Sequence, residues 1–419
     1  MATRTWTYGL TANIVVLGVV SLLTDVSSEM ILPILPFFLI SVLSANAFIV
    51  GLVEGLADSV VAFMKVVSGR WSDVAGSRRG FVAAGYGLST AMKVLFPFAQ
   101  VWTQFLGMRI AERMGKGVRD APRDALLTES TPAETRGKAF GFHRAMDTTG
   151  AVVGPILALV LLAILLPSMA EGSAYRLIIL IAAVPAAISF AVVFLVREPT
   201  RAPSRTPRFR ASLRSIPRPL VAFIAIASVF SFADFSFAFL LLRVADVGWS
   251  TFLAIVLYIL FNIVYAVHAF PAGILSDHVG RRPVILVGYG FFIAMAVLIA
   301  GLPSKVAGVP PAAPTLAVLA VGFVLYGLSY GMAEGTQRAL VADLAPAESK
   351  ATVLGAYHTS VGFVKLASGI VAGGLWFFIA PSATFVFGAI TASVAAVMLL
   401  LWRPPATSSA SGQGPARPA

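Results

Sequence analysis

Residues 109–127 concentrate eight charged side chains in a chain of which only 12% of the residues are charged. On a helix all eight would fall within an arc of about 140°, while Ile110, Met114 and Val118 would occupy the other side. The eight residues are Arg109, Glu112, Arg113, Lys116, Arg119, Asp120, Arg123 and Asp124. Such a face can form ion pairs, pass protons or bind a charged solute. We therefore expect a membrane-spanning helix, bent near Pro122, whose charged side faces the protein interior.

Other apolar segments carry similar polar stripes. Asp25 and Glu29 lie four residues apart and share one helical face, and Glu54 and Asp58 repeat that spacing. A charge at the bilayer centre costs at least about 2.5–3.5 kcal/mol, so these groups must face water or one another. We interpret twelve residues as a substrate or proton pathway: Asp25, Glu29, Glu54, Asp58, Arg113, His143, Arg144, Asp147, Asp234, Glu334, Arg338 and His358.

Proton coupling requires a carboxyl or imidazole group that exchanges protons near neutral pH. Burial and a like-charged neighbour both favour the protonated form of a carboxyl group, and Asp25 beside Glu29 offers both. An unperturbed histidine exchanges protons near neutral pH, so His143 and His358 are further candidates. The four histidines show no metal-ligand spacing and the chain has no cysteine, so we expect neither a metal site nor a cofactor.

The elements that position these residues are membrane-spanning helices. Hydrophobic residues make up 58% of the chain and its mean hydropathy is +0.88. Mostly apolar runs of about 18 residues or more are typical of spans. We expect an all-α integral membrane protein with spans in 10–43, 46–69, 81–98, 102–127, 138–166, 174–196, 219–243, 249–275, 284–302, 314–342, 352–380 and 382–402.

The distribution of positive charge predicts the orientation. If the first tail is cytoplasmic, the inside connections hold eighteen Lys and Arg residues and the outside ones hold two, Arg176 and Lys305. This asymmetry places both termini in the cytoplasm of a cell whose cytoplasmic (inner) membrane the chain crosses many times. The net charge of +12 then reflects topology and contact with anionic lipid, and no nucleic-acid partner is expected. The first apolar segment lacks a small-residue cleavage site, so we interpret it as an uncleaved helix.

A basic stretch divides the chain into two groups of six spans. Residues 197–218 contain seven Arg and one acid, which is typical of a solvated cytoplasmic linker. We therefore predict an N-terminal bundle over 1–196, a C-terminal bundle over 219–402 and a disordered tail over 403–419.

Two motifs recur in the same order in both halves. "GRWSDVAGSRRG" (69–80) matches "GILSDHVGRRP" (273–283), and "TESTPAETRGKAFG" (128–141) matches "ADLAPAESKATVLG" (342–355). Repetition of both motifs at nearly one offset indicates an internal duplication.

At these motifs the chain resembles the major facilitator superfamily over residues 10–402. The Gly-x3-Asp-x2-Gly-x-Arg-Arg loop after the second and eighth spans is similar to that family's signature. "RMGKG" (113–117) looks like the fourth-helix element, with Lys116 where Gln is commoner, and "GFHRAMDTTGAVVGP" (141–155) resembles the fifth-helix element of antiporters. The resemblance implies two pseudo-symmetric six-helix bundles around a central cavity, with alternating access to a small-molecule or ion substrate.

The same resemblance implies gating residues in the signature loops and the fifth-helix element, and the position of Arg119, Asp120, Arg123 and Asp124 toward the cytoplasmic end of their span adds these four. The signature acids lie near helix C-termini, where a carboxylate needs a cationic partner, and the glycines suit tight turns and close helix packing. The predicted gating set is Gly69, Asp73, Gly76, Arg78, Arg79, Arg119, Asp120, Arg123, Asp124, Gly141, Gly150, Gly154, Pro155, Gly273, Asp277, Gly280, Arg281 and Arg282.

These features predict a monomeric secondary transporter that exports a small charged or polar solute, drug or metal ion in exchange for protons. Uptake by proton or ion symport is the first alternative, because direction cannot be deduced from residue types. A polytopic membrane enzyme is a remote alternative. It would need a nucleophile with a base, or a metal cluster, at a membrane face, and the sequence offers neither.

Overall fold

The structure is a computed structural model that describes residues 5–6, 10–75, 77–131, 135–198, 217–346 and 350–403. The described chain is almost entirely helical. Its strand content is one antiparallel pairing of two residues each, β1 (Thr5–Trp6) with β2 (Leu10–Thr11). The prediction of an all-α membrane protein is confirmed.

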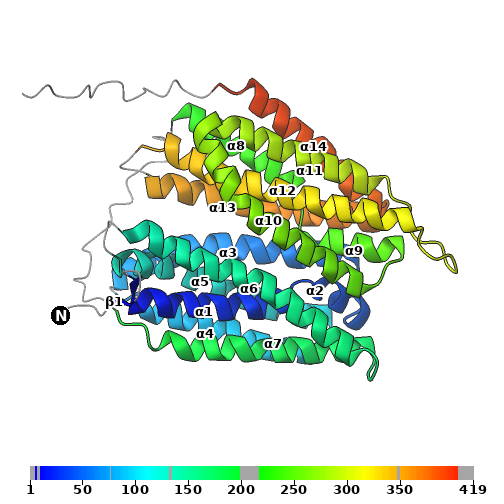
Figure 1. Ribbon diagram of the computed structural model, residues 1–419, viewed down its shortest axis with the longest axis horizontal. Helices are drawn as coiled ribbons and strands as arrows, with labels where there is room; N and C mark the ends of the chain where they lie inside the picture. The colour runs from blue at the N-terminus through cyan, green and yellow to red at the C-terminus, as the bar shows by residue number, and fades with distance from the viewer. Residues whose placement is uncertain are drawn as a thin grey trace, which may run out of the picture.

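The described helices form two groups, one from each half of the chain, and they run roughly parallel to one another in Figure 1. The first half consists of α1 (Ala12–Ile31) continued by α2 (Leu35–Phe37) and the π-helical η2 (Phe38–Val42), α3 (Ala47–Ala75), α4 (Arg79–Leu95) continued by η3 (Phe96–Phe98), α5 (Trp102–Glu129), α6 (Arg136–Leu165) and α7 (Glu171–Val193). The second half consists of α8 (Arg218–Ala233) continued by α9 (Ala238–Val247), α10 (Thr251–Val279), α11 (Arg281–Ala300), α12 (Ala313–Leu344), α13 (Lys350–Phe378) and α14 (Pro381–Leu401).

Eleven spans within the described residues are long and apolar enough to cross a membrane, and α5 is the twelfth. Its 28 residues match a bilayer-spanning length, but its charges exclude it from a purely hydropathic count. Arg109, Glu112 and Arg119 on α5 are each at most 3% exposed. The predicted helix with an inward charged face is therefore present.

The first span of each half is interrupted. Residues 32–34 separate α1 from α2, because Pro33 has no N–H to continue the helical ladder. In the second half, residues 234–237 separate α8 from α9 without a proline. There the Lys365 ammonium donates to the backbone carbonyl of Asp234, so a polar group freed by the break keeps a partner inside the membrane.

The two halves meet along α3 and α13, which lie side by side in the middle of Figure 1. Glycines make this contact possible: a Cβ atom at Gly51 would overlap the carbonyl oxygen of Gly369, and one at Gly373 would lie 2.7 Å from the Ala47 oxygen. Backbones that approach this closely gain van der Waals contact where lipid offers no hydrophobic driving force.

The hydrophobic core shows which ends of the halves are joined. One cluster runs through both halves and includes Ile34, Phe38 and Val50 of the first and Phe239 and Leu257 of the second. A smaller cluster at the opposite end, built on residues such as Ile14, Leu17 and Tyr86, contains first-half side chains only. The described halves are thus joined at the end that carries residues 43–46 and share no such core at the other end.

Candidate functional site

A central cavity of about 630 Å³ lies between the two halves. Its walls come from α1, α3, α5 and α6 of the first half, and from the α8–α9 break, α10, α12 and α13 of the second. A smaller cavity of about 170 Å³ adjoins it within the second half. The two share Tyr326, Tyr330, Glu334, Arg338 and Lys365 as wall residues.

All twelve residues of the predicted pathway line these two cavities. Ten of them line the central cavity, and Asp234 and His358 line the smaller one. The structure thus brings together side chains from seven separated stretches of sequence. The structure shows where these side chains lie, and the part that each plays in transport is a proposal.

The deepest part of the α5 face is a buried ion-pair network. Arg109 lies 3.1 Å from Glu54 of α3 and 3.3 Å from Glu112, and the Nε of Arg113 lies 3.5 Å from Glu112. Burying four charges is costly unless each is paired, and this arrangement pairs them across two helices. The network holds the cavity-lining Glu54 and Arg113 in place.

Nearer the end with the first-half core, α5 carries a second cluster. Lys65 of α3 lies 2.9 Å from Asp120, Arg123 lies 3.0 Å from Asp124, and the Arg119 guanidinium stacks 4.2 Å from the centre of the Tyr86 ring. Every one of these pairs lies within the first half. In this conformation, therefore, the predicted gating cluster of α5 makes no ion pair with the second half of the described chain.

Several charged side chains of the cavity wall form no ion pair within 4 Å in the described part of the chain. Among the described residues, no hydrogen bond or ion pair reaches Asp25, Asp58 or Lys116. Arg144 donates only to the hydroxyl of Tyr265, and its guanidinium lies 5.8 Å from the centre of that ring. These groups are available to a bound solute, to protons or to water.

Asp25 and Glu29 sit where α1 meets both α6 and the second half. A Cβ atom at Gly150 would lie 2.8 Å from the Asp25 Cβ, and one at Gly154 would lie 2.6 Å from the Glu29 Cβ. The two glycines thus let α6 pack directly on the turns of α1 that carry the acids. The Glu29 carboxylate accepts a hydrogen bond of 2.8 Å from Tyr258 of α10.

His143 and Asp147 form a dyad on α6. The Nδ1 of His143 lies 3.4 Å from the Asp147 carboxylate, which also accepts a hydrogen bond from the Ser21 hydroxyl of α1. The Nε2 of His143 is buried and has no hydrogen-bond partner among the described residues. The dyad is therefore held through its Asp147 side, and both of its residues line the central cavity.

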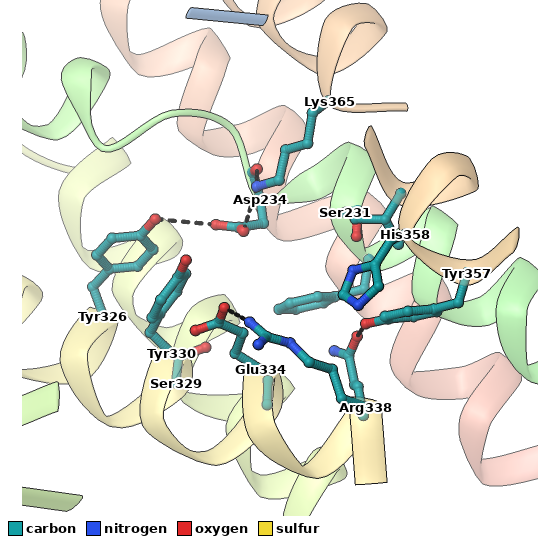
Figure 2. Close-up of a pocket in the computed structure, with 14 residues that line it drawn as sticks. Ser231, Asp234, Tyr326, Ser329, Tyr330, Glu334, Arg338, Tyr357, His358 and Lys365 are labelled. Atoms are coloured by element: carbon teal, nitrogen blue, oxygen red, sulfur yellow. Dashed lines mark hydrogen bonds and ion pairs between the residues drawn. The ribbon is translucent and has the colours of Figure 1, made fainter. Parts of the chain in front are cut away.

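The second half contributes its own charged centre, shown in Figure 2. Lys365 lies 2.6 Å from the Asp234 carboxylate, which also accepts a hydrogen bond of 3.1 Å from Tyr326. Glu334 pairs with Arg338 one turn along α12. Lys365 was not part of the predicted pathway set, although its place on the span with His358 could have indicated it.

An aromatic wall was missed by the sequence reasoning. It consists of Tyr258, Phe261 and Tyr265 on α10 and Tyr326 and Tyr330 on α12, all of which line the central cavity. Phe261 lies 5.0 Å from Tyr326, and Tyr265 lies 5.2 Å from Tyr330, between ring centres. On α10 the aromatic residues are three and four positions apart, and on α12 they are four apart. Each set therefore shares one face of its helix, and a search for aromatic stripes would have found them.

Lys93 of α4 was also missed. Its ammonium is buried and donates to the hydroxyls of Ser27 and Ser28, at 3.0 and 2.9 Å. It lies behind the segment of α1 that separates Asp25 from Glu29. A single lysine in an apolar run gives no sequence signal that would distinguish it from a residue at a membrane interface.

The profile of the Major Facilitator Superfamily matches residues 17–363 and, in a second alignment, residues 221–419. An uncharacterized MFS-type transporter of Methanocaldococcus jannaschii is 36% identical over 397 residues, which cover 93% of this chain and 95% of that protein. The chain belongs to the major facilitator superfamily. An uncharacterized protein of Mycobacterium tuberculosis is 34% identical over 162 residues, or 39% of this chain.

Solved structures of the major facilitator fold superpose on nearly the whole chain. A mutant of the nucleoside transporter NupG gives a TM-score of 0.76 at 13% identity and covers 93% of this chain and 99% of its own. A D-xylose-proton symporter gives 0.71 at 15% identity, over 93% and 97% of the two chains. At these identities the likeness concerns the fold, and it supports twelve helices in two bundles around a central cavity.

The family's signature loops are built alike in the two halves. Arg78 lies 2.9 Å from Asp73 and 3.1 Å from Glu129 at the end of α5, while Arg281 pairs with Asp277 and lies 3.1 Å from Asp343 at the end of α12. The second arginine of each loop donates to backbone carbonyls at the end of a helix. Arg79 donates to Phe194 after α7, and Arg282 donates to Leu399 and Leu400 of α14.

Glu198 adds a contact that the sequence did not suggest. Its carboxylate accepts hydrogen bonds from the backbone N–H groups of Arg78 and Arg79 and from the Ser77 hydroxyl. The one acid of the basic segment therefore caps the N-terminus of α4. The rest of that predicted linker, residues 199–216, and the predicted tail beyond Arg403 lie outside the described residues.

Several glycine predictions need correction. Gly69 and Gly273, expected in turns, lie inside α3 and α10, because these helices continue to Ala75 and Val279. A Cβ atom at Gly141 or Gly273 would meet no described atom within 4 Å, so neither glycine allows a close helix approach. Gly280 does occupy a turn, with φ +94°, and Gly76 lies outside the described residues. Pro155 lies inside α6.

Proposed function

We propose that this major facilitator protein is a secondary active transporter that exports a small charged or polar solute in exchange for protons. The observation that carries the proposal is the position of Asp25 and Glu29. Both acids line the cavity where α1 contacts α6 and α10, and neither has a cationic partner within 4 Å among the described residues. A carboxyl group in this position can hold either a proton or a cationic part of the solute.

Exchange follows from competition between the two ligands. The deprotonated acids bind solute from the cytoplasm, and protons from the outside displace it after the halves have rocked. The neutral carboxyl groups then allow the return movement and release their protons inward. Five other charged groups of the first half line the same cavity as this pair: Arg113, Lys116, Arg119, Arg123 and Asp147.

The proposed rocking bodies are residues 1–196 and 219–402, moving about the α3–α13 contact. We place both termini in the cytoplasm and the protein in the inner membrane of the cell that exports the solute. In this orientation the described conformation is inward-facing. The shared core then closes the outer end, and the first-half core lies at the separated inner end. We further propose that the monomer carries out the whole cycle, since the cavity is formed by one chain.

The D-xylose-proton symporter shares this fold, so symport is the alternative to be tested. The two mechanisms predict opposite proton movements. In proteoliposomes that enclose a pH-sensitive dye, added solute that enters by antiport drives protons out and makes the lumen alkaline. Entry by symport makes the lumen acidic. The sign does not depend on which way the protein faces.

The experiment presents divalent metals, amphipathic cations, organic acids and zwitterions in turn to such proteoliposomes. We expect alkalinisation with at least one class, and its loss in a protein carrying both Asp25→Asn and Glu29→Gln. Lys305→Gln, an exposed residue of the 301–312 connection, serves as the control and should keep the full response. Acidification, or an unchanged response in the double variant, would overturn the proposal.

A further inference from the structure

We infer that the central cavity binds a compact zwitterion that carries an ammonium group, a carboxylate and a flat apolar part. The inference rests on the proposed function, since it takes the central cavity as the transport site. It is carried by three sets of groups in the wall of that cavity, two charged and one aromatic, which match three parts of one solute.

The first set consists of two carboxylates beside the aromatic wall. Glu29 accepts a hydrogen bond of 2.8 Å from Tyr258 and has no basic partner within 4 Å among the described residues. Asp58 is exposed, lines the cavity and makes no hydrogen bond or ion pair within the described chain. Carboxylates at the edge of electron-rich rings form a favourable environment for an ammonium group.

The second set consists of two cations one turn apart on α5. Arg113 contacts an acid only through its Nε, 3.5 Å from Glu112, so its two terminal amino groups have no acceptor within the described chain. Such a fork matches the two oxygens of a carboxylate. Lys116, on the same face, has no partner among the described residues either.

The two sets line the same cavity. Arg113 and Lys116 enter its wall from α5, Asp58 from α3 and Glu29 from α1. A solute whose ammonium and carboxylate groups are separated by a short chain could contact both sets at once. An organic cation would leave Lys116 and the terminal nitrogens of Arg113 without an acceptor, and an organic anion would leave Glu29 and Asp58 without a cation, at the cost that unmatched charges carry in such a site.

The third set is the aromatic wall itself. Tyr258, Phe261 and Tyr326 follow one another with ring centres 5.8 and 5.0 Å apart, and Tyr330 lies 6.0 Å from Phe261. Stacked and edge-on rings at these distances offer a flat apolar surface opposite the charged wall. The cavity of about 630 Å³ is large enough for a solute of amino-acid or dipeptide size.

Four matched probes test this inference by thermal stabilisation and equilibrium binding to the purified full chain. Tryptophan carries all three parts, tryptamine lacks the carboxylate, indole-3-propionate lacks the ammonium group, and glycine lacks the ring. We expect tryptophan to bind at least tenfold more tightly than each of the other three. Equal or tighter binding of tryptamine or indole-3-propionate, or no binding by any probe, would overturn the inference.

Variants of the wall residues test which residue binds which charged group of the probe. In Glu29→Gln and in Asp58→Asn, the ammonium group of the probe should no longer contribute to the binding affinity. Tryptophan and indole-3-propionate should then bind equally. In Arg113→Gln, tryptophan and tryptamine should bind equally. Lys305→Gln, in the exposed 301–312 connection and outside the cavity wall, should leave the order of the four probes unchanged. An unchanged order in all three cavity variants would remove these residues from the site.

The proton assay separates this inference from the proposed function. Tight tryptophan binding without any proton movement would overturn the function and leave the binding class standing. Alkalinisation driven by a metal or an organic cation, with no binding of tryptophan, would overturn the zwitterion inference and leave the proposed function standing.

Discussion

The hydroxyl of Tyr258 donates a hydrogen bond of 2.8 Å to Glu29 and so joins the first span of one half to the second span of the other. Polar contacts between the halves are few among the described residues. The others include Ser59 with Gly362, Arg144 with Tyr265, and Tyr175 with Thr251. The Tyr258–Glu29 contact is distinctive because its acceptor is one of the two proposed coupling acids.

Replacing Tyr258 by Phe should weaken the described conformation relative to the opposite one. A hydrogen bond to a charged group contributes about 1.5–3 kcal/mol, so the population ratio should change by roughly tenfold or more. Since the chain has no cysteine, Ser168→Cys and Lys305→Cys can carry spin labels across the joined end. A longer distance in Tyr258→Phe is the expected result, and an unchanged distance distribution would contradict it.

The α3–α13 contact should tolerate no side chain at Gly369. In Gly369→Ala the new Cβ would overlap the Gly51 carbonyl oxygen and approach the Gly55 Cα to 3.2 Å, and backbone cannot move aside as a flexible side chain can. We expect the halves to separate at this end and transport to fall by at least tenfold. Gly355→Ala on the same helix is the matched control, since its Cβ would meet nothing within 4 Å. Equal transport by the two variants would refute this role of the contact.

The glycines of α6 should differ sharply in their tolerance of alanine. Gly150→Ala places a Cβ 2.8 Å from Asp25 and 2.9 Å from the Leu22 oxygen, so α1 must shift, at a cost of about 1–3 kcal/mol. Gly141→Ala meets open space and should be neutral or stabilising by up to about 1 kcal/mol, because alanine favours the helix. Thermal unfolding in detergent measures both, and similar midpoints for the two variants would count against the packing argument.

The two signature loops should contribute unequally to stability despite their similar geometry. The Arg78 side chain is 10% exposed, whereas Arg281 is 24% exposed and its partner Asp277 is 61% exposed. Arg78→Gln should therefore cost about 1–3 kcal/mol, and Arg281→Gln less than about 1 kcal/mol, because solvent screens the second pair.

Chemical or thermal unfolding of the two variants side by side checks this order. High salt should reduce the effect of Arg281→Gln further while changing that of Arg78→Gln little. If Arg281→Gln lowered the free energy of unfolding more than Arg78→Gln, burial would not determine how much these ion pairs stabilise the protein.

Much of this protein could be deduced from its amino-acid sequence. Hydropathy and length identified the spans, since a bilayer requires about 20 apolar residues in a helix. The angular pattern of residues 109–127 identified α5 as a span with an inward charged face, because charges in lipid must turn toward the protein interior. The repeated motifs predicted two similar halves, and the twelve pathway residues all line the two connected cavities.

The tertiary structure decided which groups satisfy one another. Periodicity along a helix shows that Asp25 and Glu29 share a face, but it contains no information about Tyr258, which lies 229 positions away from Glu29. It likewise could not distinguish Gly150, which allows α1 to approach, from Gly141, which faces open space, because a glycine's neighbours belong to another helix. Partners across helices depend on how whole spans pack, and that is set by the sum of many distant contacts rather than by local pattern.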